Sequence, residues 1–237
     1  MRPWSSIPIV ENHELLVALP AVLLRLEPHP YASLGAPYGP DHDPFRLRSG
    51  VVDRLVQAQR RLAEQDPTLR FAIFDAWRPI AVQAFMVEHT IATLCAEQGI
   101  SRDDPSQQSA VQAVIQDVAR FWAAPSRDAS TPPPHSTGAA VDLTLASLDG
   151  DRPLDMGGAI DAIGAISEPD YYASASTASE RLFHQRRLLL LKVMESVGFQ
   201  QHPNEWWHFS HGDQLWAWRS GSPSAIYAEA PIKSVTA

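Results

Sequence analysis

His135-Ser-Thr-Gly-Ala-Ala-Val-Asp142 and, further along the chain, Glu205-Trp-Trp-His208 are the two stretches that organise this protein. Two histidines and an aspartate can hold a zinc ion at three corners of a tetrahedron and leave the fourth for water, which is the arrangement of catalytic zinc sites. A glutamate three residues before the last histidine is then available as a general base. We therefore predict His135, Asp142 and His208 as zinc ligands and Glu205 as the base.

The spacing of the first two ligands constrains the backbone between them. A fully extended chain would hold His135 and Asp142 roughly 23 Å apart, which is too far for both to bind one ion. The chain must therefore reverse direction between them, and Gly138 is the residue that permits such a turn. Asp142 is then expected to point inward from a strand.

Glu205 and His208 pose the opposite problem. A spacing of three residues places two side chains on one face of a helix but on opposite faces of a strand. The aromatic residues Trp206 and Trp207 between them favour a strand. We therefore expect Glu205 in the bend that follows Pro203-Asn204, and His208 inside the strand.

On spacing alone, other interpretations stay open. The chain has nine histidines, and polar side chains are more often solvated or structural than metal-binding. His135 and Asp142 could be a loop histidine and a solvated acid. His202 or His211 could replace His208 as the third ligand.

The composition is that of an ordinary globular protein, with 237 residues of which 45% are hydrophobic and 19% charged. A net charge of −8 argues against nucleic acids and anionic membrane surfaces as partners. The apolar run 15–26 contains Pro20 and is too short to cross a bilayer, and the N-terminal stretch lacks the apolar core of a signal peptide. We therefore expect no membrane association and a cytoplasmic protein.

The hydrophobic periodicity predicts one α+β domain over residues 1–237, with a small antiparallel sheet that carries the zinc site between flanking helices. Residues 1–48 are expected to form an irregular, proline-rich arm, and residues 219–237 a C-terminal strap. Strands are predicted at 69–75 and 139–145. Helices are predicted at about 50–66, 79–99, 107–123 and 179–197, with a long loop over 153–180.

The two opening stretches resemble the zinc motif pair of the D-Ala-D-Ala metallopeptidases, and their details resemble the D-alanyl-D-alanine dipeptidase branch associated with vancomycin resistance. Further stretches match that family in the same order along the chain. The resemblance spans roughly residues 31–217 and includes 75–79, 135–145, 156–161, 186–199 and 205–209.

The resemblance implies one Zn²⁺ per chain and hydrolysis of the dipeptide D-Ala-D-Ala to free D-alanine. It assigns Arg78 to stabilisation of the oxyanion, Asp161 to the substrate ammonium group and Tyr31 to the pocket wall. An ion pair between Arg78 and Asp75 is the ordinary structural alternative for that arginine. The implied partner is a small dipeptide, and the oligomeric state is left open.

The chain departs from the family pattern at three places. Pro133 and Pro134 stand where serines usually precede the first zinc histidine, Ile160 replaces an aromatic residue, and the loop 168–172 lacks a histidine. Three rival hypotheses therefore remain. They are a D,D-carboxypeptidase or endopeptidase acting on longer peptidoglycan peptides, a non-catalytic zinc-containing peptide-binding module, and a structural zinc site.

Overall fold

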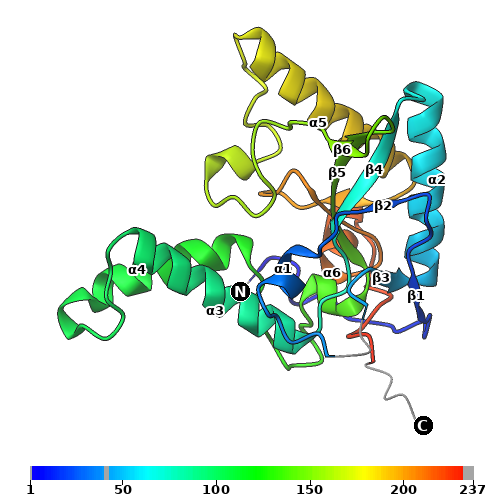
Figure 1. Ribbon diagram of the computed structural model, residues 1–237. Helices are drawn as coiled ribbons and strands as arrows, with labels where there is room; N and C mark the ends of the chain where they lie inside the picture. The colour runs from blue at the N-terminus through cyan, green and yellow to red at the C-terminus, as the bar shows by residue number, and fades with distance from the viewer. Residues whose placement is uncertain (1, 40–42, 232–237) are drawn as a thin grey trace.

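The computed structural model describes residues 2–39 and 43–231, and its centre is a six-stranded sheet (Figure 1). The strands cross the sheet in the order β2, β4, β5, β8, β7, and β6 pairs with one end of β5. β5 is buried along almost its whole length, as expected for a strand that is covered on both faces. The bounds are β2 Leu24–Arg25, β4 Leu69–Asp75, β5 Ala140–Ser147, β6 Arg152–Pro153, β7 Gln200–Gln201 and β8 His208–Ser210.

The fold is α+β, as predicted. The sheet is mixed, whereas the sequence predicts an antiparallel one. β2 runs parallel to β4, with Leu24 opposite Ala72, whereas the other pairs in this sheet are antiparallel. A parallel neighbour is reached by a crossover rather than a hairpin. Because β2 has only two residues, no hydrophobic period in the sequence indicates it.

The N-terminal arm, predicted to be irregular over 1–48, contains short regular elements. β1 (Leu16–Ala18) and β3 (Arg46–Arg48) form a separate antiparallel pair, and α1 (Pro30–Ser33) is a single turn. Such short strands exist because partners distant in sequence complete their backbone hydrogen bonds. Local composition therefore does not predict them.

Two groups of helices pack on different parts of the molecule. α2 (Ser49–Gln65) and α5 (Ala178–Ser196) contact one another, and α2 packs on β4 while α5 packs on β5. α3 (Ile80–Glu97) and α4 (Gln108–Phe121) form a helical hairpin that projects away from the sheet (Figure 1). Each group has its own apolar cluster, and the second cluster joins α3 and α4 to Tyr31 in the arm.

The end of the described chain folds back over the body. After α6 (Gln214–Ser220), Ala225 pairs with Ile9 of the arm, and the Ala230 amide donates to the Ser136 carbonyl. Residues 232–237 of the predicted strap lie outside the described residues, as do residues 1 and 40–42 of the arm. Over the part of the chain that is described, no helix is both long and apolar enough to span a membrane.

Candidate metal centre and active site

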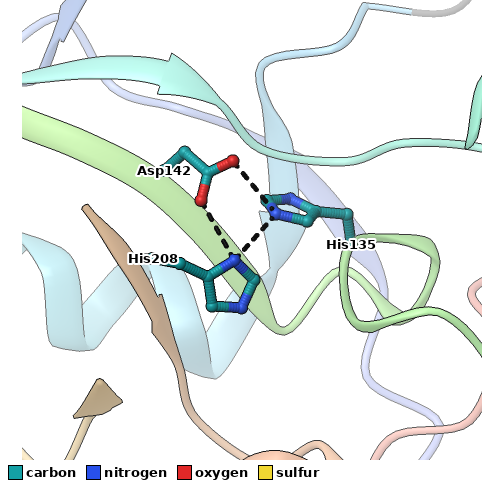
Figure 2. A group of neighbouring side chains, drawn as sticks. All are labelled: His135, Asp142 and His208. Atoms are coloured by element: carbon teal, nitrogen blue, oxygen red, sulfur yellow. Dashed lines mark hydrogen bonds and ion pairs between the residues drawn. The ribbon is translucent and has the colours of Figure 1, made fainter. Parts of the chain in front are cut away.

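Three buried side chains from two separate stretches of the chain meet at one point (Figure 2). The His135 Nε2 atom lies 3.2 Å from Asp142 Oδ2 and 3.2 Å from His208 Nδ1. His208 Nδ1 lies 3.0 Å from Asp142 Oδ1. Within the described residues, these three form the group of His, Cys, Asp and Glu side chains whose ligand atoms are close enough to hold one metal ion.

The local backbone places the ligands as the sequence requires. His135 lies in a 3₁₀ turn (Pro134–Thr137) that ends at Gly138, where φ is +72° and the chain reverses. A Cβ atom at Gly138 would also collide with the Leu16 side chain, so glycine is needed there for space as well as for its positive φ. Asp142 of β5 lies opposite His208 of β8 in the antiparallel register, which joins the two motifs.

The donor set fits a cation. Zinc with four ligands at about 2.0–2.1 Å separates neighbouring ligand atoms by about 3.3 Å, which is close to the spacing here. His135 Nδ1 lies 2.7 Å from the Ala76 carbonyl oxygen, which can only accept a hydrogen bond, so the neutral ring carries its hydrogen on Nδ1 and keeps the Nε2 lone pair toward Asp142. Burial opposes a charge at this point, yet Asp142 raises the pKa of His135 above its ordinary value. The carboxylate therefore attracts positive charge to the place where an ion would bind.

Glu205 lies beside this group rather than within it. It follows the turn at Pro203-Asn204, as predicted, and its Oε2 atom is 3.6 Å from His208 Nδ1. Burial, and then the negative charge of Asp142, raise the pKa of Glu205 well above its ordinary range. A carboxylate whose affinity for protons is raised in this way is suited to accept one during a reaction.

His202 and His211, the two alternatives to His208 as the third ligand, do not join the metal-binding group. His202 lines the same pocket, but its Nδ1 atom faces Glu205 Oε1 at 3.5 Å and accepts from the Asn204 amide. His211 does not line this pocket, and its ring packs against that of Trp216, with ring centroids 4.8 Å apart. Strand register explains the difference, because β8 begins at His208 and directs that side chain toward Asp142.

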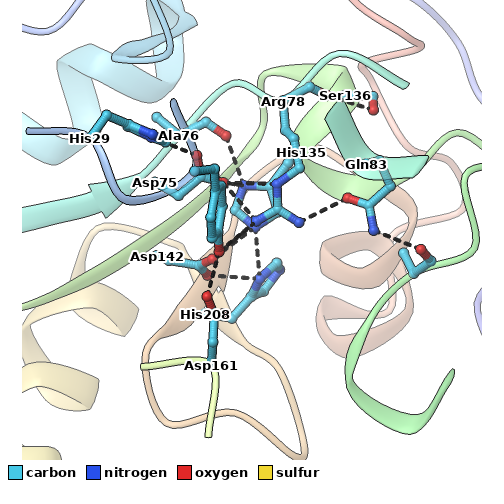
Figure 3. Close-up of polar contacts among 12 residues, drawn as sticks. His29, Asp75, Ala76, Arg78, Gln83, His135, Ser136, Asp142, Asp161 and His208 are labelled. Atoms are coloured by element: carbon cyan, nitrogen blue, oxygen red, sulfur yellow. Dashed lines mark hydrogen bonds and ion pairs between the residues drawn. The ribbon is translucent and has the colours of Figure 1, made fainter. Parts of the chain in front are cut away.

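Arg78 enters the site from the segment after β4 and is buried (Figure 3). Its Nε and Nη2 atoms both donate to Asp75 Oδ2, at 3.0 and 2.7 Å, and Nη1 donates to Gln83 Oε1 at 2.8 Å. The ion pair that sequence offered as the structural alternative is therefore present. The same guanidinium also faces the metal group, with Nη2 3.6 Å from Asp142 Oδ2.

Asp75 has a larger role than the sequence suggested. Besides Arg78, it contacts His29 Nε2 at 3.1 Å and His135 Nδ1 at 3.4 Å. Burial opposes its ionisation, but Arg78, and after it His29, lower the pKa of Asp75 to about 2. Asp75 is therefore a buried anion that orients both Arg78 and the predicted ligand His135. Its position in the sequence, three residues before Arg78, indicates only the first of these contacts.

Tyr31 and Asp161 meet at another wall of the site. The Tyr31 hydroxyl donates to Asp161 Oδ2 at 2.6 Å and accepts from Arg78 Nη2 at 3.3 Å. Asp161 has a positive φ of 65°, a strained backbone conformation that aspartate tolerates better than most residues. Burial, and then repulsion from Asp142, raise the pKa of Asp161 to about 7, against the lowering effect of Tyr31.

Comparison with known proteins identifies the family of this chain. A family model described as D-ala-D-ala dipeptidase matches residues 25–226, and a D-alanyl-D-alanine dipeptidase of Synechocystis sp. is 45% identical over 228 residues, which cover 92% of this chain and 90% of that protein. The chain belongs to the D-Ala-D-Ala dipeptidase family. It is accordingly a peptidase.

More distant relatives were also found by sequence and by structure. A D-alanyl-D-alanine dipeptidase of Enterococcus faecalis is 35% identical over 80 residues, which cover 34% of this chain and 37% of that protein. Among solved structures, a vancomycin-resistance D,D-pentapeptidase in complex with Zn(II) is 13% identical, with a TM-score of 0.47 over 92% of this chain and 95% of that chain.

In this dipeptidase-family chain, the loop that carries Asp161 is attached to α5 through Arg187. That buried guanidinium donates to the carbonyl oxygens of Met156, Ile166 and Glu168 at 2.9, 3.1 and 3.0 Å. A single side chain therefore fixes both ends of the segment that places Asp161 beside Tyr31. The predicted long loop over 153–180 is irregular apart from β6, a 3₁₀ turn (Ala165–Ser167) and the first residues of α5.

We expect Arg187→Met to destabilise the protein by about 2–4 kcal/mol, because carbonyls of the loop lose hydrogen bonds to a charged donor. The same variant should raise KM for a dipeptide more than it lowers kcat, since Asp161 loses its fixed position. Urea unfolding and steady-state kinetics measure the two effects. Arg186→Met is the matched control, because Arg186 makes one exposed bond to the Asp155 carbonyl. Equal effects of the two substitutions would contradict the role given to Arg187.

Proposed function

We propose that this chain is a zinc-dependent dipeptidase that hydrolyses D-Ala-D-Ala to free D-alanine. His135, Asp142 and His208 hold one Zn²⁺, Glu205 is the general base and Arg78 stabilises the oxyanion. The observation that carries the proposal is the buried triangle of ligand atoms with the Glu205 carboxylate beside it. The family membership of the chain supports the choice of substrate.

The proposed mechanism divides the chemistry among these residues. Zinc held by three protein ligands supplies a Lewis acid and lowers the pKa of water to about 7. Glu205 accepts a proton from the attacking water and passes it to the nitrogen of the leaving D-alanine. The scissile C–N bond breaks as that proton arrives, and the new carboxylate keeps the oxygen from water.

Arg78 lines the same pocket, and we assign it to the scissile carbonyl. Its guanidinium is permanently charged and held by Asp75 and Gln83, so it is oriented before the substrate arrives. Negative charge that develops on the carbonyl oxygen is then stabilised without any rearrangement of the side chain. The ion pair with Asp75 therefore supports the catalytic role of Arg78.

Asp161 is proposed to bind the free ammonium group of the dipeptide. Tyr31 fixes the carboxylate at 2.6 Å, and a bound ammonium would favour the ionised form of a group whose pKa lies near 7. This recognition separates a dipeptidase from enzymes that act inside or at the end of longer chains.

Replacing Asp161 with asparagine should raise KM for D-Ala-D-Ala by about tenfold to hundredfold, the effect of losing one charged pair. KM for N-acetyl-D-Ala-D-Ala, which has no ammonium group, should stay unchanged. Steady-state kinetics on both substrates measure the difference. Asp155→Asn is the control, since Asp155 lies on the same loop and, within the described residues, its carboxylate accepts one hydrogen bond, from the nearby Gly157 backbone amide. An equal loss on both substrates would remove the ammonium role.

Release of alanine tests the function directly. D-Ala-D-Ala, L-Ala-L-Ala and N-acetyl-D-Ala-D-Ala are compared with and without chelator, and zinc is then added back. Turnover of D-Ala-D-Ala alone, lost with chelator and restored by zinc, is the expected result. Turnover of the blocked peptide would favour the carboxypeptidase hypothesis, and zinc binding without any turnover would favour a peptide-binding module.

Two further predictions accompany this proposal. Residues 1–237 are proposed to form one domain, because both apolar clusters supply walls of the pocket, Trp122 from one and Trp207 from the other. A single cooperative thermal transition would support that, and two separate transitions would oppose it.

Cytoplasmic location stays a prediction that cell fractionation can test.

A further inference from the structure

A dipeptide has two charged ends, and the proposed site has so far a partner for only one. The substrate carboxylate needs a cation or a group of donors. Among the described residues that line the pocket, the permanently charged cations are Arg2 and Arg78. Arg78 already donates to Asp75, Gln83 and Tyr31. Under the proposed mechanism, the remaining hydrogen-bond donors of Arg78 serve the oxygen of the scissile carbonyl.

Three other polar side chains at or near the pocket already donate to backbone carbonyls. The Ser136 hydroxyl donates to the Arg78 carbonyl at 2.7 Å, and the Thr137 hydroxyl donates to the Pro134 carbonyl at 2.6 Å. Gln83 donates its amide nitrogen to the Ala123 carbonyl at 2.6 Å. Pro134 forms part of the wall and has neither an amide hydrogen nor a polar side chain.

Arg2 differs from all of these groups. The one hydrogen bond described for its side chain is a long one, 3.5 Å from Nη2 to the Phe121 carbonyl, and no ion pair joins it to a carboxylate in the described part of the chain. It lines the pocket that also contains Glu205 and His208, and its charge interacts with that of Glu205. It is therefore a half-buried cation that lines the pocket and has N–H donors without a strong hydrogen-bond partner in the described residues.

The segment that carries Arg2 is attached firmly enough to position it. Trp4 is buried, and its ring lies 5.7 Å from the ring of His202 and 5.4 Å from that of Trp218. The Arg2 guanidinium lies over the Trp4 ring at 5.5 Å. The Gln214 amide nitrogen donates to the carbonyl of Ile7 at 2.6 Å, which ties the same segment to α6.

We propose that Arg2 binds the C-terminal carboxylate of the dipeptide substrate. This inference rests on the proposed function and adds the second half of substrate recognition. Asp161, with Tyr31, takes the ammonium end from the loop before α5, and Arg2 takes the carboxylate end from the N-terminal arm. A substrate held at both charged ends leaves no place for a longer peptide, so Arg2 is also a specificity-determining residue.

Kinetics on paired substrates test the proposal. D-Ala-D-Ala is compared with D-alanyl-D-alaninamide, whose C-terminal amide carries no charge, in the zinc-loaded full chain and in Arg2→Gln. We expect Arg2→Gln to raise KM for D-Ala-D-Ala about tenfold to hundredfold, the effect of one charge-assisted contact, and to leave KM for the amide unchanged. Arg2→Lys, which keeps the charge, should recover part of the loss. Arg120→Gln, at an exposed arginine of α4, is the control and should behave as wild type.

A binding measurement separates recognition from catalysis. Calorimetry with D-Ala-D-Ala on the slow variant Glu205→Gln, with and without Arg2→Gln, should show the same loss of affinity as the kinetics. Equal loss on the acid and the amide, or no loss on either, would overturn the role of Arg2 while the proposed function stands. Absence of D-Ala-D-Ala turnover by the unmodified enzyme would instead overturn the proposed function, and the role of Arg2 with it.

Discussion

Glu205→Gln is expected to lower kcat for D-Ala-D-Ala by about a hundredfold to ten-thousandfold while one zinc ion per chain stays bound. General acid–base catalysis contributes a factor of that size. Glutamine keeps the shape of the side chain but cannot accept the proton of the attacking water. The ligand atoms of His135, Asp142 and His208 face one another without help from Glu205, so the metal should remain. Kinetics and metal analysis of the purified variant measure both outcomes.

Glu195→Gln is a suitable control, because Glu195 is an exposed residue near the end of α5. It should match the wild type in activity and zinc content. Loss of zinc from Glu205→Gln would identify Glu205 as a fourth ligand. The site would then be closed in the manner of structural zinc sites, and the catalytic proposal would fail.

Arg78→Met is expected to act on both activity and stability. Loss of an oxyanion donor should lower kcat/KM by about a hundredfold to thousandfold. The free energy of unfolding should also fall by about 3–5 kcal/mol, because Asp75 is left as a buried anion without its main partner. Alanine release and urea unfolding report the two effects.

The double variant Asp75→Asn with Arg78→Met separates the two roles of the arginine. Asparagine removes the charge at Asp75 but keeps a hydrogen-bonding side chain near His29 (Figure 3). We expect most of the stability to return and the activity to stay low. If activity returned together with stability, Arg78 would be only a structural partner of Asp75, as sequence allowed. Arg78→Lys should remain impaired, since lysine cannot reproduce the paired donation to Asp75.

The parts of the site that could be predicted from sequence depend on local chemistry. The turn at Gly138, the strand around Asp142 and the bend before His208 follow from the backbone preferences of a few neighbouring residues. Long helices and the central strands appear close to their predicted positions for the same reason. For example, the strand predicted at 139–145 is β5 at 140–147.

Elements whose existence depends on distant partners could not be predicted in this way. β2 forms because it lies beside β4, and β1 because it lies beside β3. Each has two or three residues, too few for a hydrophobic period. The sequence therefore predicts an irregular N-terminal arm and an antiparallel sheet.

The sequence alone determined which residues could bind a metal and accept a proton, because ligand chemistry belongs to the residue types and their spacing. Tertiary structure decided which histidine completes the group and what surrounds it. His208 rather than His202 or His211 faces Asp142 because of the register between β8 and β5. The Tyr31–Asp161 contact spans 130 positions of the chain. Arg2 reaches the pocket because packing of its arm brings it there, and contacts between such distant segments leave no local signal in a sequence.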